Sequence, residues 1–168
     1  TATKIYANIE AASYLQSALK LIEEKEGELW KRADILERLG DIKSLVGEYD
    51  VCIKYWNDAL PLRKQRDEKE KVSRLHRKIA SVLWNEIGET EKAKEHHDKA
   101  LKILEDQPES VELASLYEDI ARMSWRIGDP VNALSWGEKA LELAKKLNAH
   151  EVIARSYASM GTILSSAG

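Results

Sequence analysis

The feature that most constrains this chain is a short cassette that recurs four times along the sequence. In each copy a small residue is followed, seven positions later, by the dipeptide Ala-Leu. The copies begin 41, 41 and 40 residues apart. A period in this range is typical of stacked helical repeats, which form long surfaces and seldom enclose an enzyme pocket. The copies are Ala11 with Ala18-Leu19, Cys52 with Ala59-Leu60, Ala93 with Ala100-Leu101, and Ala133 with Ala140-Leu141.

Glycines mark the same repeat a second time, at spacings of 41, 40 and 40 residues. Before each glycine, apolar residues recur at steps of three and four, as in Leu39, Ile42 and Val46, which places them on one stripe of an α-helix. Glycine readily takes the left-handed conformation that ends a helix. Each glycine should therefore separate a first helix from the second helix that carries the cassette. The glycines are Gly47, Gly88, Gly128 and Gly168.

The sequence therefore predicts an all-α chain of antiparallel helix hairpins, with no β alternation. We expect one array over residues 1–168, and we expect that array to be part of a longer protein. The array should begin with a lone second helix at 5–24 and end with a lone first helix at 151–166. Three complete hairpins should lie between them, at 29–64, 71–105 and 110–147.

Composition narrows the function classes. Of the 168 residues, 26 are basic and 29 acidic, and a formal net charge of -3 gives the chain no overall attraction to nucleic acid or anionic membranes. No run of 18 apolar residues is present, so we expect no membrane span. The single cysteine, Cys52, excludes an internal disulfide and fits a reducing compartment, so we expect a cytoplasmic location. Cys52 stands where other copies have Ala, which indicates a buried packing residue.

With its cassettes, glycines and helix hairpins, the sequence resembles the tetratricopeptide repeat family. The resemblance is carried by Gly40 and Gly161 inside first helices, by Gly47-x-Tyr49 opening a second helix, and by the small-x6-Ala-Leu cassette. It covers essentially the whole chain and implies a right-handed superhelix, or α-solenoid. It also implies that the fold serves protein binding and not catalysis.

Two departures from the family pattern are informative. The usual period is about 34 residues, whereas this one is 40 to 41. The longer period resembles the variant found in kinesin light chains, in spindle-orientation adaptors and in the repeat arms of prokaryotic signalling ATPases and regulators. The family's first-helix Trp is absent from its slot, which holds Leu36, Arg77, Tyr117 and Tyr157.

The resemblance implies that first helices line a concave groove that binds extended or helical peptides. This groove would run from acidic to basic and suit a partner with a basic and then an acidic stretch, with an apolar group against Trp125. The alternative is an ordinary solvated helix face. Two groove acids, Glu37 and Asp41, occupy the slots where chaperone-binding relatives clamp a carboxylate, and they disfavour that use. The residues that should face the groove are Glu37, Asp41, Lys78, Asn85, Glu118, Arg122, Trp125, Arg126 and Arg155.

The sequence gives less support to a metal site or to RNA binding. His96 and His97 are adjacent on a helix and point about 100° apart, so they cannot share a metal ion from one face, and we expect no metal site. His97 occupies a packing slot that holds Leu15 and Trp56 in other copies. The stretch from Arg63 to Lys78 has eight basic residues against three acids but no aromatic for base stacking. We interpret it as a solvated linker and regard RNA binding as a minor alternative.

No catalytic or cofactor-binding motif is present, so we expect a chain that is not an enzyme and needs no cofactor. The leading hypothesis is a protein-interaction scaffold for a protein or peptide partner. The alternative is a regulatory or sensor arm of a larger signalling ATPase, nucleotide cyclase or transcription regulator. The lone helices at the two ends leave apolar stripes open, which suggests self-association.

Overall fold

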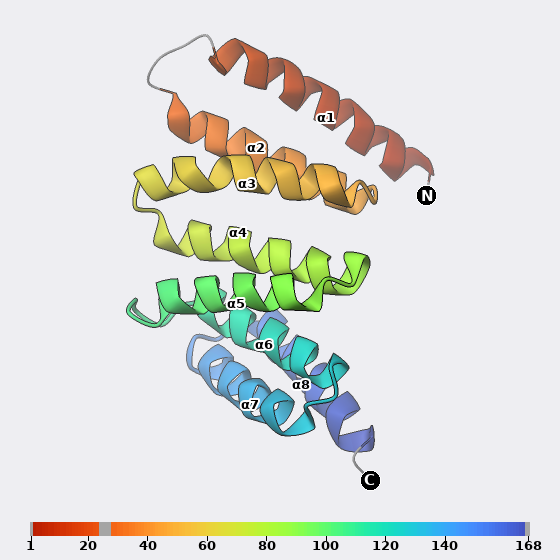
Figure 1. The fold of residues 1–168 in the computed structure, drawn as a ribbon, viewed down its shortest axis with the longest axis vertical. Coiled ribbons are helices and arrows are strands. Elements are labelled where there is room, and N and C mark those ends of the chain that lie inside the picture. Colours follow the sequence, from red (N-terminus) through yellow and green to blue (C-terminus); the bar gives the residue numbers. More distant parts are fainter. Residues whose placement is uncertain (1, 24–27, 167–168) are drawn as a thin grey trace.

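The computed structural model describes residues 2–23 and 28–166, and every regular element in these ranges is a helix. The helices stack in chain order along the long axis, with α1 at one end and α7 and α8 at the other (Figure 1). The predicted all-α fold is confirmed. The elements are α1 (Ala2–Glu23), α2 (Leu29–Leu45), α3 (Tyr49–Gln65), α4 (Lys69–Val82), the π-helix η1 (Leu83–Ile87), α5 (Thr90–Leu104), α6 (Val111–Arg126), α7 (Pro130–Lys146) and α8 (His150–Ser166).

The most extensive helix contacts join α2 with α3, α4 with α5, and α6 with α7, at the positions of the three predicted hairpins. At the two ends, α1 packs on α2, and α8 packs on α7 and α6. Residue 24, the last of the lone second helix predicted at 5–24, and Gly168 of the glycine series lie outside the described residues.

The first helices of successive hairpins also touch one another. α4 contacts α6, and α6 contacts α8, while ion pairs join α2 to α4. α2, α4 with η1, α6 and α8 thus form one layer, and α3, α5 and α7 pack against it. We call the open side of that layer the first-helix face.

The cassettes explain why the helices nest so closely. Cys52, Ala93 and Ala133, together with the second small residue of each of these copies, are fully buried. A helix whose contact positions carry so little side chain lets its neighbour approach closely, and the exclusion of water from the packed apolar surface stabilises the pair. The first copy differs, because Ala11 and Ala18 are only half-buried.

The glycine stops form as predicted at the three glycines within the described residues. Gly47, Gly88 and Gly128 have φ angles of 80°, 86° and 83°. After the third, Asp129 caps α7 by accepting a hydrogen bond from Asn132 N, and Pro130 occupies the first turn. Pro is suited to that position because its missing N–H would have no helical partner there.

The π-helical turn η1 is a feature that the periodicity did not predict. It ends the first helix of the second hairpin, where the backbone N–H of Glu89 donates to the carbonyl of Leu83 at 2.8 Å. Asn85 Nδ2 donates to the Ser81 carbonyl at 3.0 Å within this wider segment. π-helical turns are rare and are often found at functional sites, and this one carries Trp84 toward the first-helix face.

Candidate functional site

At the α2 end of the first-helix face, Glu37 is the centre of a charged cluster. Its carboxylate binds Arg63 of α3 at 3.1 Å and both Arg74 Nε and Lys78 Nζ of α4 at 3.1 and 3.0 Å. Burial alone would raise the pKa of Glu37, but the positive charges of Lys78 and Arg74 outweigh burial and lower it to about 2. Lys78 also binds Asp41 at 2.7 Å.

This cluster corrects the expected groove. Glu37 is only 7% exposed and its charge is satisfied within the array. Asp41 is more open, but it accepts hydrogen bonds from both Trp56 and Lys78. The acidic end predicted from the sequence is therefore neutralised by cations of α3 and α4, and neither Glu37 nor Asp41 is left unpaired for a basic stretch on a partner.

The next junction, between α4 and α6, depends on Arg77. Its guanidinium binds the Glu112 carboxylate through two nitrogens, at 2.6 and 3.1 Å, and Asp119 at 2.9 Å. Burial opposes the charged form, but the two carboxylates raise the pKa of Arg77 above its ordinary value. Arg77 occupies the slot of the family's missing Trp, so an ion-pair cluster fills a position usually filled by an aromatic ring.

The interpretation of 63–78 as a solvated linker is therefore wrong for its most important residues. Arg63 is 2% exposed and binds Asp34, Glu37 and Glu68. Arg63 joins α3 to α2 and to the turn before α4, whereas Arg77 joins α4 to α6 of the next hairpin. The sequence could not show this, because the acids that pair with these arginines lie up to 42 residues away.

The far end of the first-helix face carries a pocket that we call the Trp–Arg pocket, a hollow of about 240 Å³. It spans three successive first helices. The guanidinium groups of Arg122 and Arg126 lie over the indole of Trp84. Each Cζ is 5.5 Å from the ring centroid, in the range of cation–π contacts. The lining residues are Trp84 from η1, Arg122, Trp125 and Arg126 from α6, and Ser159, Thr162 and Ile163 from α8.

Beneath this pocket lies Glu118, which is 1% exposed. Its Oε1 accepts a hydrogen bond from Ser159 at 2.8 Å, and its Oε2 is 4.0 Å from Arg155 Nε. Burial, followed by repulsion from Asp119, raises the pKa of Glu118. Glu118 was expected to face a partner, and this is a second correction: its side chain is covered by α8.

Of the nine residues predicted for the groove, three therefore meet in one pocket: Arg122, Trp125 and Arg126. Asn85 is half-buried and bonded to Ser81, and Arg155 donates to Ser115 Oγ at 3.4 Å. Trp84 is not among the residues predicted for the groove. A signal for it existed, since Trp84 and Trp125 are 41 residues apart, one repeat period.

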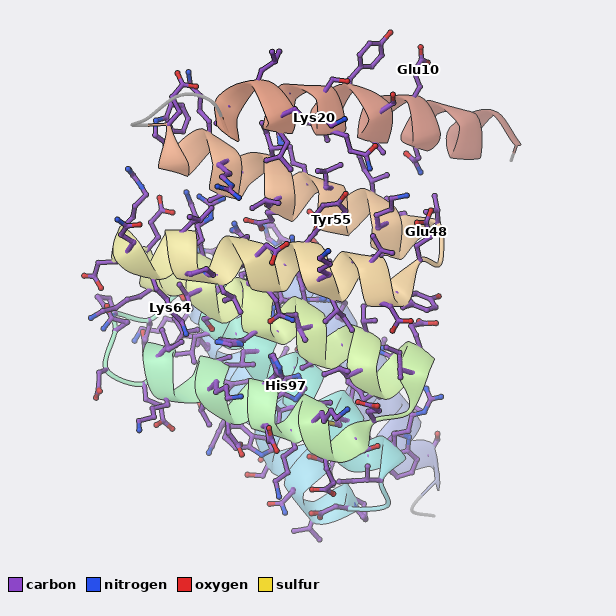
Figure 2. The ribbon with its side chains drawn as sticks, turned by 45° about the horizontal axis from the view of Figure 1, so that its top comes forward. Glu10, Lys20, Glu48, Tyr55, Lys64 and His97 are labelled. Carbon is purple, nitrogen blue, oxygen red and sulfur yellow. The ribbon has the colours of Figure 1, made fainter. Side chains whose placement is uncertain are left out.

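The two adjacent histidines of α5 have different surroundings. His97, on α5 (Figure 2), is buried as a packing residue. His96 instead faces His76 of α4, with their Nδ1 atoms 3.0 Å apart. Burial and the neighbouring charge of His96 lower the pKa of His76 to about 4. Among the described residues, no three His, Cys, Asp or Glu side chains gather closely enough to hold a metal ion.

Cys52 is a free, buried thiol that donates to the Tyr49 carbonyl at 3.1 Å. Burial raises its pKa to about 11, so the nucleophilic thiolate is scarce at neutral pH. Within the described part of the chain, no helix combines the length and the apolar character that crossing a bilayer requires.

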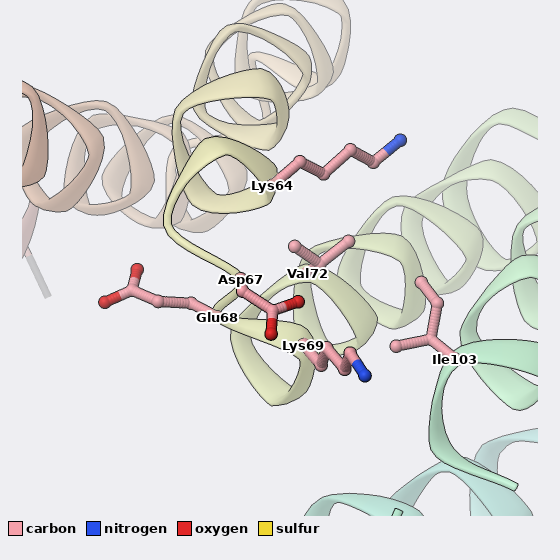
Figure 3. Close-up of a pocket in the computed structure, with 6 residues that line it drawn as sticks. All are labelled: Lys64, Asp67, Glu68, Lys69, Val72 and Ile103. Atoms are coloured by element: carbon pink, nitrogen blue, oxygen red, sulfur yellow. The ribbon is translucent and has the colours of Figure 1, made fainter. Parts of the chain in front are cut away.

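A smaller hollow of about 160 Å³ lies where the α3–α4 turn meets α5 (Figure 3). Val72 and Ile103 supply its apolar surface, and Lys64, Asp67 and Lys69 surround it with both signs of charge. Glu68 at its edge already binds Arg63 and Lys71. The mixed charges give this hollow no preference for a ligand of either sign.

Residues 31–106 match the family model described as the tetratricopeptide repeat. That segment includes two cassettes and two of the left-handed glycines. The match supports the resemblance to the tetratricopeptide repeat family over residues 31–106. A comparison with curated protein sequences finds no match.

Solved structures share the fold. The chain is similar to BtubC (BKLC) from P. vanneervenii, with a TM-score of 0.83 and 19% identity over 99% of this chain and 68% of that one. It is also similar to aspartyl phosphate phosphatase F from Bacillus subtilis, with a TM-score of 0.86 and 15% identity over 96% of this chain. A third is the Rap conjugation gene regulator of the plasmid pLS20 in complex with the Phr* peptide, with a TM-score of 0.74 and 18% identity over 92% of this chain. The chain spans 42% of the length of each of the last two.

Proposed function

We propose that this chain is a non-catalytic interaction module whose first-helix face binds a peptide or protein segment. The observation that carries the proposal is the Trp–Arg pocket, which draws side chains from η1, α6 and α8. Three packed helices hold these groups in place before a partner arrives. Binding therefore costs little ordering entropy.

The fold comparisons support this proposal without naming a partner. One similar structure, the Rap conjugation gene regulator, is a complex with a peptide. At 18% identity this likeness is one of fold alone. The peptide-binding role proposed here therefore rests on this chain's own pocket. A scaffold acting in the cytoplasm, where the free thiol of Cys52 stays reduced, is part of the proposal.

A second candidate is a regulatory arm of a larger signalling protein. It is supported by the names of two similar structures, a phosphatase and a gene regulator, each more than twice as long as the segment that this chain matches. The sequence of the full-length gene tests it. A nucleotide-binding, cyclase or DNA-binding segment beside the array would support the regulatory-arm hypothesis. The absence of such a segment would favour the scaffold hypothesis.

Self-association through the end helices is a further part of the proposal. Exposed apolar side chains lie on α1 at Tyr14 and Leu21 and on α8 at Leu164. Sedimentation velocity tests this. A dimer that becomes monomeric in Leu21→Glu or Leu164→Glu supports it, and a monomeric wild-type chain at high concentration contradicts it.

Display of random 12-residue peptides tests the main proposal. Peptides selected on the wild-type chain should protect amides of α6 and α8 from hydrogen exchange and should lose binding in Trp125→Ala. The control is Val131→Ala, which removes an exposed apolar side chain from α7 and should leave binding unchanged. Protection confined to α3, α5 and α7 would place the docking surface on the other layer and end the proposal.

A further inference from the structure

The Trp–Arg pocket carries positive charge that the array leaves largely uncompensated. The closest carboxylate oxygens to Arg122 are those of Asp119, at 3.7 Å, and Glu118, at 4.0 Å. Both distances are beyond hydrogen-bond range. Asp119 is already bound by Arg77 at 2.9 Å, and burial favours the neutral form of Glu118 by raising its pKa.

Arg126 is more open still. It is exposed, and no ion pair within 4.0 Å is found for it among the described residues. This contrasts with Arg63, Arg74, Arg77 and Lys78 at the α2 end, each of which binds at least one carboxylate. The first-helix face is thus neutralised at one end and cationic at the other.

The pocket also presents hydrogen-bond donors that suit a planar anion such as a carboxylate. The Cζ atoms of Arg122 and Arg126 each lie 5.5 Å from the centroid of the Trp84 ring, and a guanidinium group in a cation–π contact still has N–H groups that can donate to a carboxylate. Trp84 is 7% exposed, and its indole N–H has no acceptor within the described residues. Ile163 and Trp125 supply apolar surface beside these donors.

We propose that the Trp–Arg pocket binds an internal Asp or Glu side chain of a protein partner, next to an apolar side chain that packs on Trp125 and Ile163. This rests on the proposed function and deepens it by naming the partner's chemistry. A lysine or arginine in the same place would face two guanidinium groups and be repelled. An aliphatic residue alone would leave the guanidinium edges without an acceptor.

The test is selection from two random peptide libraries, one with amidated and one with free C-termini, on the wild-type chain and on Arg122→Gln/Arg126→Gln. The matched control is Lys94→Gln/Lys102→Gln, which makes the same charge change at exposed positions of α5. Peptides from the amidated library should contain an Asp or Glu beside an aromatic or aliphatic residue. Replacing that acid by its amide, or either arginine by Gln, should weaken binding by roughly tenfold.

The outcomes separate this inference from the function on which it rests. One contrary result is that peptides bind the first-helix face with no preference for an acidic residue, and another is that they bind the double Arg variant with equal affinity. Either result would overturn the binding of an Asp or Glu side chain in the Trp–Arg pocket and would leave the proposed docking function standing. Binders found only in the free-terminus library would assign the pocket to a terminal carboxylate and overturn an internal side chain. No binder at all on the wild-type chain would remove the proposed function itself. Circular dichroism of each variant confirms that the array is folded.

Discussion

Gly40 lies directly against the indole ring of Trp56. A Cβ placed on Gly40 would be 2.4 Å from both Cδ1 and Nε1 of Trp56. The ring cannot easily move aside, because Trp56 is buried and its Nε1 donates to Asp41 Oδ1 at 3.1 Å. This contact fixes the distance between α2 and α3 in the first complete hairpin.

We therefore expect Gly40→Ala to destabilise the array. Overpacking outweighs the better helix propensity of Ala, for a net loss of about 1 to 2 kcal/mol in the free energy of unfolding. Gly161 is the matched control, because nothing lies within 4 Å of its added Cβ. Gly161→Ala should stabilise α8 by roughly 0.5 to 1 kcal/mol. Urea unfolding followed by circular dichroism measures both, and a stabilised Gly40→Ala would refute the close contact.

The cassette makes a larger prediction. Ala140 is fully buried between helices of the third hairpin, so Ala140→Trp requires space that the packed layers lack, and Ala100→Trp does the same in the second. We expect each variant to lose its cooperative melting transition. Ala158→Trp, at an exposed position of α8, should melt as the wild type does. A wild-type melting curve for Ala140→Trp would show that the small residues are not what lets the helices nest.

Arg77 should be essential to the junction between α4 and α6. Arg77→Met leaves the buried carboxylates of Glu112 and Asp119 without their partner, which should cost about 3 kcal/mol or more. Adding Glu112→Gln and Asp119→Asn to that variant removes the unpaired charges and should recover part of the loss. Arg38→Met, at an exposed site on α2, is the control. A triple variant no more stable than Arg77→Met alone would argue against charge as the cause.

His97 should make stability depend on pH. Burial, only partly offset by the charge of Asp119, lowers its pKa to about 4, compared with about 6.5 in an unfolded chain. The unfolded chain therefore binds more protons between pH 4 and 6.5, and the free energy of unfolding falls as pH is lowered through this window, by about 2 to 3 kcal/mol from this residue.

His97→Leu places in this slot the residue that the first copy of the repeat carries, Leu15. It should reduce the pH dependence of the free energy of unfolding between pH 4 and 6.5 by the share that His97 contributes, while the share of His76 remains. At pH 7 it should also stabilise the fold by about 1 kcal/mol, because both ring nitrogens of His97 are buried without a hydrogen-bond partner in the described structure. His150→Leu, at an exposed position, is the control. Urea titrations at several pH values measure the free energy of unfolding, and an equal change with pH in the wild type and in His97→Leu would contradict the assignment.

Much of the fold was accessible from the sequence. The fixed spacing of Cys52, Ala93 and Ala133 predicted close helix pairing, and all three are fully buried. The left-handed glycines predicted where first helices end, and the φ angles agree. These features are local, since each depends on which residues share one face of a helix or on one backbone conformation.

The sequence alone determined the repeat, the helices and the small residues that let them nest, because each of these follows from the spacing of residues along one helix or one hairpin. Only the tertiary structure decided which charges on the first-helix face are paired. Glu37 meets Lys78 across 41 positions, whereas Arg126 meets no such partner within the described residues. The strength of a charge interaction depends on distance and burial in space, and those quantities exist only after the hairpins have stacked.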